Sequence, residues 1–165
     1  EIDSTLVHEY GHYLSFEASQ LDYKDFSDMA FKESPPADSD DAFRNKVCKP
    51  LFFNSNGCLR ENSLLGLFFK KFWKGKIFDD FLYYTTSGKE DSQEREEAWF
   101  KEYRPQFVSD YATGTPYEDF ADSFKFFIEQ DKPTGNSIVD QKLLFFYDFE
   151  KLKSLRTHIR TKIGK

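Results

Sequence analysis

The chain has 165 residues, which is enough for one domain with a sizeable core and too few for two, so we expect a single domain over residues 1–165. Charged residues make up 32% of the chain and the net charge is −6; an acidic surface repels phosphate backbones, so nucleic acid is not an expected partner. No apolar run approaches the roughly 18 residues that cross a membrane, and we expect no transmembrane segment.

Near the start of the chain, two histidines four residues apart flank a glutamate, in the order His8, Glu9, Tyr10, Gly11, His12. On a helix the two imidazoles lie one turn apart on the same face, with Glu9 beside them. This arrangement is typical of a zinc site with a general base next to it. The alternative is a pair of solvated or buried histidines with a glutamate between them by chance. We predict metal binding, because the chain has only three histidines and two of them are here.

The same stretch is predicted to be a helix, with Asp3 or Ser4 as its N-cap. Apolar side chains recur at helical spacing and form a stripe, namely Leu6, Tyr10, Tyr13 and Leu14. The stripe faces away from the histidines, so we expect it to hold the helix against the core while the histidines line a cleft. Gly11 in mid-helix costs about 1 kcal/mol relative to alanine, which indicates that something approaches the backbone closely there.

Residues 19–105 contain no further catalytic group of residues, and we expect them to form an insertion that shapes a substrate cleft. Caps, breakers and apolar periodicity predict helices over 21–34, 40–47, 64–73 and 92–104. The aromatic run within 78–85 fits a strand as well as a helix. The 20 phenylalanines of the chain are expected to form most of the core.

Cysteine occurs twice, at Cys48 and Cys58, on either side of a loop that contains proline and glycine. Two cysteines in this position are compatible with one disulfide and a secreted or extracellular protein. The alternative is a pair of reduced, buried thiols in a cytosolic chain. At the end of the chain, residues 151–165 carry six lysines or arginines and no acid, which we interpret as a solvated helix face. The alternative is a surface that contacts an acidic partner.

A catalytic zinc takes three ligands from the protein, so a third ligand must follow the two histidines. Pro116 fits the first turn of a helix that runs to about Glu129, and this helix is the best candidate. On it, Glu118 and Asp122 share one face; Glu118 can bind the metal while Asp122 accepts the free N–H of a ligating histidine. Asp119 is an alternative ligand, but it points about 100° away from Glu118.

The two motifs, from His8 to His12 and from Glu118 to Asp122, together resemble the gluzincin metallopeptidases. Tyr111, seven residues before Glu118, makes the chain most similar to the group of the anthrax lethal factor catalytic domain and the Pro-Pro endopeptidases. The resemblance implies a mainly α, zincin-like catalytic domain. It also implies an upstream β-sheet, which is missing or minimal here, so we expect the chain to be the C-terminal part of a longer protein.

These observations predict a zinc-dependent endopeptidase that acts on a polypeptide substrate. One Zn²⁺ is held by His8, His12 and Glu118, Glu9 is the general base, and Tyr111 assists the reaction. Two alternatives remain, an inactive zinc-binding interaction module of the same fold and the catalytic fragment of a secreted toxin.

Overall fold

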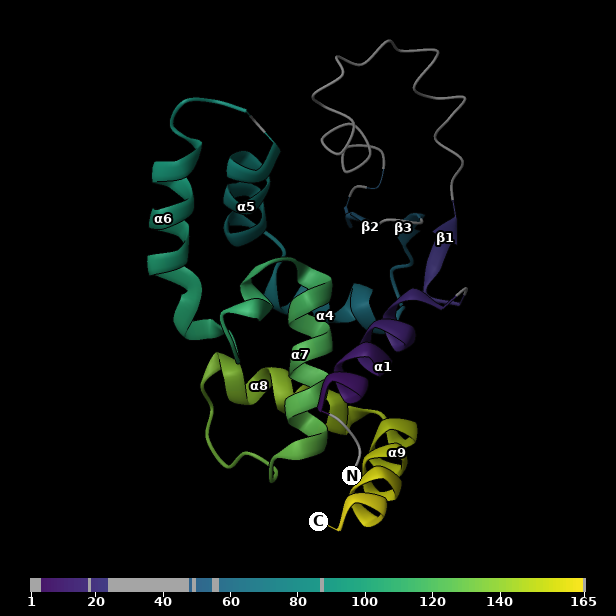
Figure 1. The fold of residues 1–165 in the computed structure, drawn as a ribbon. Helices are drawn as coiled ribbons and strands as arrows, with labels where there is room; N and C mark the ends of the chain where they lie inside the picture. The colour runs from purple at the N-terminus through teal and green to yellow at the C-terminus, as the bar shows by residue number, and fades with distance from the viewer. Residues whose placement is uncertain are drawn as a thin grey trace. The chain divides into compact units, whose positions relative to one another are not determined.

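The computed structural model describes residues 4–17, 19–23, 48, 50–54, 57–86 and 88–164 (Figure 1). The chain divides into two compact units, one formed by Glu1–Ser15 with Arg104–Lys165 and the other by Phe16–Tyr103. The described part is mainly helical, as expected, with three short strands. None of the helices in these ranges has the length and apolar character that a membrane span needs.

The unit Phe16–Tyr103 begins with a small antiparallel sheet in the order β1-β3-β2. Its strands are β1 (Leu21–Tyr23), β2 (Phe53–Asn54) and β3 (Gly57–Leu59). The helix predicted from Leu21 is therefore wrong at its start, because the backbone of 21–23 pairs with 57–59, a partner that local periodicity does not show. The rest of that prediction and the helix predicted over 40–47 lie outside the described residues.

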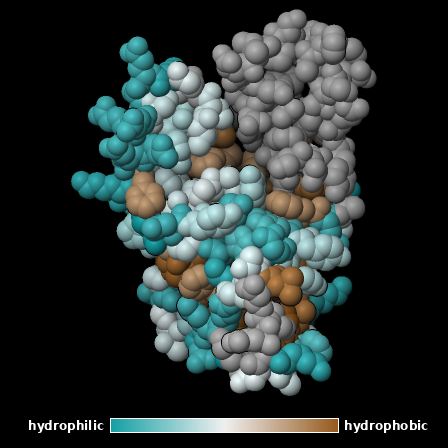
Figure 2. Space-filling view, in the orientation of Figure 1, coloured by the Kyte–Doolittle hydropathy of each residue, from teal (hydrophilic) through white to brown (hydrophobic). Residues whose placement is uncertain are grey.

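Cys48 and Cys58 form a disulfide in this unit, with their Cα atoms 5.1 Å apart. Three helices follow, α4 (Leu64–Phe72), α5 (Lys76–Thr86) and α6 (Ser92–Tyr103). The ambiguous aromatic run is thus helical. Trp73 packs its indole against Phe81 and Trp99, and Trp99 Nε1 donates a hydrogen bond of 2.8 Å to the carbonyl of Ile77. Because only Trp99 and Tyr103 of α6 are buried, the outer side of that helix is largely hydrophilic (Figure 2).

The other unit consists of α1 (Ser4–Phe16) and the elements after Tyr103. These are η2 (Arg104–Gln106), η3 (Tyr111–Thr113), α7 (Pro116–Glu129), α8 (Ile138–Phe145), η4 (Phe146–Asp148) and α9 (Glu150–Ile163). The rings of Phe120, Phe124 and Phe127 on α7 meet Phe146, and these four side chains are almost fully buried. The aromatic core expected from the composition is present in both units.

The prediction that an apolar stripe holds α1 to the core is wrong. Leu6, Tyr10 and Tyr13 are 62%, 40% and 59% exposed, whereas the buried residues of the helix are Val7, His8, Gly11 and Ser15. The reason is a close helix crossing at Gly11, where an added Cβ would lie 2.8 Å from Ala121 Cα. The backbone of α1 therefore approaches α7 on the side that carries the histidines, as the mid-helix glycine indicated.

The basic residues of α9 are not all solvated, which corrects our interpretation of 151–165. Arg156 donates to the carbonyls of Phe127 and Gln130 at 2.6 Å each. Arg160 donates to the carbonyls of Ile128, Glu129 and Gln130 at 3.0–3.1 Å. The last carbonyls of a helix have no partner within it and carry partial negative charge, so these two guanidinium groups cap the C-terminus of α7.

Candidate metal centre

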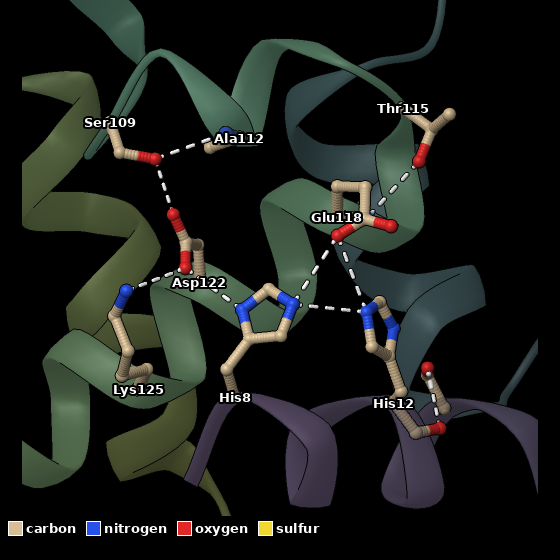
Figure 3. Close-up of polar contacts among 9 residues, drawn as sticks. His8, His12, Ser109, Ala112, Thr115, Glu118, Asp122 and Lys125 are labelled. Carbon is tan, nitrogen blue, oxygen red and sulfur yellow. Dashed lines mark hydrogen bonds and ion pairs between the residues drawn. The ribbon is translucent and has the colours of Figure 1, made fainter. Parts of the chain in front are cut away.

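Two helices far apart in sequence bring three possible metal ligands together (Figure 3). His8 and His12 project from one face of α1, and their Nε2 atoms lie 3.1 Å apart. Glu118, in the first turn of α7, places Oε2 3.3 Å from His8 Nε2 and 3.2 Å from His12 Nε2. The three atoms thus form a nearly equilateral triangle.

The size of this triangle fits a zinc ion. Zinc binds imidazole nitrogen and carboxylate oxygen at about 2.0–2.1 Å in tetrahedral geometry, so two of its ligand atoms lie roughly 3.3–3.4 Å apart. The three observed separations of 3.1, 3.2 and 3.3 Å are close to that distance. Three protein ligands of this kind leave a fourth position for water or substrate, as catalytic zinc sites do.

Hydrogen bonding leaves a lone pair of His8 directed toward the triangle. Asp122 Oδ1 lies 2.8 Å from His8 Nδ1. Because an ionised carboxylate only accepts hydrogen bonds, Nδ1 carries the proton, and Nε2 of the neutral ring carries a lone pair. Glu118 Oε2 is buried and lies 3.3 Å from His8 Nε2, which has no hydrogen to donate to it. A buried carboxylate oxygen facing imidazole nitrogens is costly unless a cation joins them, which is the chemistry of a metal site.

Burial and nearby charges keep His12 and Asp122 in the protonation states that a metal site requires. Burial lowers the pKa of His12 below 6.5, with Glu118 acting in the opposite direction, so the ring is neutral at neutral pH. Burial raises the pKa of Asp122, but hydrogen bonds from Lys125, Ser109 and His8 outweigh it and lower that pKa below 3.8. Asp122 is therefore an ionised carboxylate that accepts the hydrogen bond from His8 Nδ1.

Asp122 has two partners that the sequence analysis missed. Lys125 Nζ lies 2.8 Å from Asp122 Oδ1, and Ser109 donates its hydroxyl hydrogen to Asp122 Oδ2 (Figure 3). The spacing of Lys125, three residues after Asp122 on a helix, is a signal that could have indicated the ion pair. Nothing in the local pattern indicates Ser109, because its contact depends on how the loop before η3 folds back onto α7.

The remaining predicted residues lie beside the three ligands. Glu9 is exposed and lines a pocket of about 320 Å³ together with His8 and Tyr111. The Tyr111 ring lies 5.5 Å from the His8 ring, centroid to centroid, and the side chain is 63% exposed. The negative charge of Glu118 is the main cause that raises the pKa of Tyr111, so its hydroxyl keeps its proton and remains a donor.

Local sequence explains how α7 presents Glu118. Thr115 caps the helix by accepting the backbone N–H of Glu118 at 3.1 Å, and Pro116 occupies the first turn, where its missing N–H costs nothing. Asp119, the alternative ligand, points elsewhere. It is fully buried, and its Oδ2 lies 2.7 Å from Lys142 Nζ, so the structure groups Glu118 and not Asp119 with the histidines.

Comparisons with models of protein families, with curated proteins and with solved structures found no match to this chain.

Proposed function

We propose that this chain is a zinc-dependent endopeptidase of the gluzincin type, with a zincin-like fold. The observation that carries the proposal is the triangle of His8 Nε2, His12 Nε2 and Glu118 Oε2, with Glu9 and Tyr111 lining a pocket next to His8. A purely structural zinc site is closed by four protein ligands and needs neither a base nor an adjoining pocket.

Glu9 and Tyr111 act beside the metal in peptide hydrolysis. When bound, zinc supplies Lewis acidity, which lowers the pKa of a water molecule and polarises a carbonyl. Glu9 takes the proton from the attacking water and returns it to the leaving amine as the C–N bond breaks. The Tyr111 hydroxyl donates a hydrogen bond to the substrate oxygen that becomes negative in the transition state. One such donor is worth about 3 kcal/mol.

The surroundings of the site agree with this proposal. A polypeptide can reach Glu9 and Tyr111, because both side chains are exposed. The disulfide between Cys48 and Cys58 is compatible with an extracellular protein, and we include that location in the proposal. The toxin fragment would share this chemistry.

The test replaces Glu9 with glutamine and measures peptide cleavage and metal affinity separately. With zinc-loaded protein and a peptide library read by mass spectrometry, we expect Glu9→Gln to lower kcat roughly 10²- to 10⁴-fold. Its affinity for Co²⁺, followed by visible absorption, should stay within about threefold, because Glu9 is not a ligand. Glu94→Gln, an exposed change on α6, is the matched control and should leave both quantities unchanged.

Two outcomes would overturn the proposal. Tight zinc binding with no cleavage of any library peptide would favour the inactive interaction module. Cleavage that survives Glu9→Gln, or that persists after a chelator has removed the metal, would show that the hydrolysis has another mechanism.

A further inference from the structure

Ser109 lies where two parts of the candidate site meet, and its hydroxyl group makes two hydrogen bonds at once. It donates to Asp122 Oδ2 on α7, and it accepts the backbone N–H of Ala112 at 3.0 Å (Figure 3). A hydroxyl is the smallest side-chain group that can donate and accept in this way, so both bonds depend on one oxygen atom.

The two bonds lead to different functional groups. On the Asp122 side, the next hydrogen bond runs from His8 Nδ1 to Asp122 Oδ1 at 2.8 Å, so Ser109 helps to hold the carboxylate that orients His8. On the other side, Ala112 is the neighbour of Tyr111 in η3, so the same hydroxyl fixes the turn that carries the tyrosine. Tyr111 is 63% exposed, which means that side-chain packing does little to fix its position.

We infer that Ser109 is a positioning residue that sets the Tyr111 turn and the Asp122–His8 pair relative to each other. The inference rests on the proposed function for the part played by Tyr111, and it adds a residue that the two motifs do not contain. Without the hydroxyl, Asp122 keeps Lys125 and His8 as partners. The Ala112 amide loses this acceptor, and the residue that precedes the Tyr111 turn loses its hydrogen bond to α7.

The experiment compares Ser109→Ala with Ser109→Thr, which keeps the hydroxyl. In metal-free protein, we expect the Ala112 amide of Ser109→Ala to exchange with deuterium about five- to tenfold faster than in the wild type. Affinity for Co²⁺ should fall about tenfold, the lower end of the effect of outer hydrogen-bond partners on metal sites. In the zinc-loaded protein, kcat should fall with little change in KM, since Tyr111 acts in the transition state. Ser109→Thr should restore all three.

Thr113→Ala is the matched control, because Thr113 lies in the same turn but donates to the carbonyl of Asp110 and not to Asp122. It should leave Co²⁺ affinity unchanged. The inference is wrong if Ser109→Ala behaves like the wild type in amide exchange and Co²⁺ affinity, or if Thr113→Ala weakens Co²⁺ binding as much. Amide exchange and Co²⁺ affinity are measured without substrate. If Ser109→Ala changes neither, the role of Ser109 is overturned, whereas an absence of peptide cleavage overturns the proposed function.

Discussion

At the scale of single residues, His12 makes the stability of the metal-free protein depend on pH. Burial lowers the pKa of His12 below the ordinary 6.5. Between that pH and the lower folded pKa, His12 is protonated in the unfolded chain but neutral in the folded chain. The free energy of unfolding should therefore fall as the pH falls from about 6.5 toward the lower folded pKa. Urea denaturation at a series of pH values measures this slope.

His12→Gln should flatten the slope over that range, while His158→Gln, an exposed change on α9, should leave it as it is. An equal slope in His12→Gln and the wild type would contradict the expectation. Protonation of Asp122 adds a separate loss of stability at more acidic pH, near and below 3.8, because its folded pKa is lowered too.

The residues of the candidate site differ in how far sequence alone could indicate them. His8, Glu9 and His12 follow from helical spacing, and so does the pairing of Glu118 with Asp122. Which histidine Asp122 would bind was open, because that depends on how α1 crosses α7. Ser109 was out of reach, since its contact to Asp122 spans a turn whose path no local pattern gives.

At the scale of elements, the crossing of α1 and α7 depends on Gly11. In an exposed helix, glycine to alanine is favourable by up to about 1 kcal/mol. Here the new Cβ would lie 2.8 Å from the Cα of Ala121, so α1 must move away from the helix that carries Glu118. We expect Gly11→Ala to destabilise the protein by about 1–3 kcal/mol and to weaken Co²⁺ binding about tenfold.

Leu6→Ala on the exposed side of α1 is the control and should change stability by less than about 0.5 kcal/mol. A large loss from Leu6→Ala with none from Gly11→Ala would mean that the apolar stripe holds the helix after all. Apolar periodicity failed for α1 because this helix buries His8, Gly11 and Ser15, a set that no hydrophobicity pattern selects. It succeeded for α7, whose buried face is rich in phenylalanine.

A buried ion pair connects α7 to α8. The side chains of Lys142 and Asp119 are 1% and 0% exposed, and Lys142 Nζ also lies 3.8 Å from the centre of the Phe107 ring. Burial lowers the pKa of Lys142 even though Asp119 opposes the shift. Removing one partner leaves an uncompensated buried charge, so Lys142→Met should cost about 3–5 kcal/mol in chemical denaturation.

The double variant Lys142→Met with Asp119→Asn separates the charge from the packing. Asparagine leaves no buried charge and can still accept the hydrogen bond from Ser123, so about half of the lost stability should return. If Lys142→Met is as stable as the wild type, the pair does not hold the two helices together.

At the scale of the whole molecule, the candidate centre and the disulfide belong to different units. His8, His12 and Glu118 lie in the unit of Glu1–Ser15 with Arg104–Lys165, and Cys48 and Cys58 lie in Phe16–Tyr103. The second unit nearly coincides with the insertion expected over 19–105, because those bounds follow from the two motifs that flank it. Composition alone does not indicate that such a segment forms a compact unit of its own.

The two units can be followed separately in one protein. Both tryptophans of the chain, Trp73 and Trp99, lie in Phe16–Tyr103, so tryptophan fluorescence reports that unit, while the visible absorption of bound Co²⁺ reports the other. Replacing both cysteines with serine opens a short loop and should cost about 2–3 kcal/mol. We expect the fluorescence transition in urea to move to a lower midpoint, while Co²⁺ affinity under native conditions stays within about threefold, because no ligand belongs to that unit. A joint loss of metal affinity and fluorescence midpoint would show instead that the ligands keep their places only when Phe16–Tyr103 is held by its disulfide.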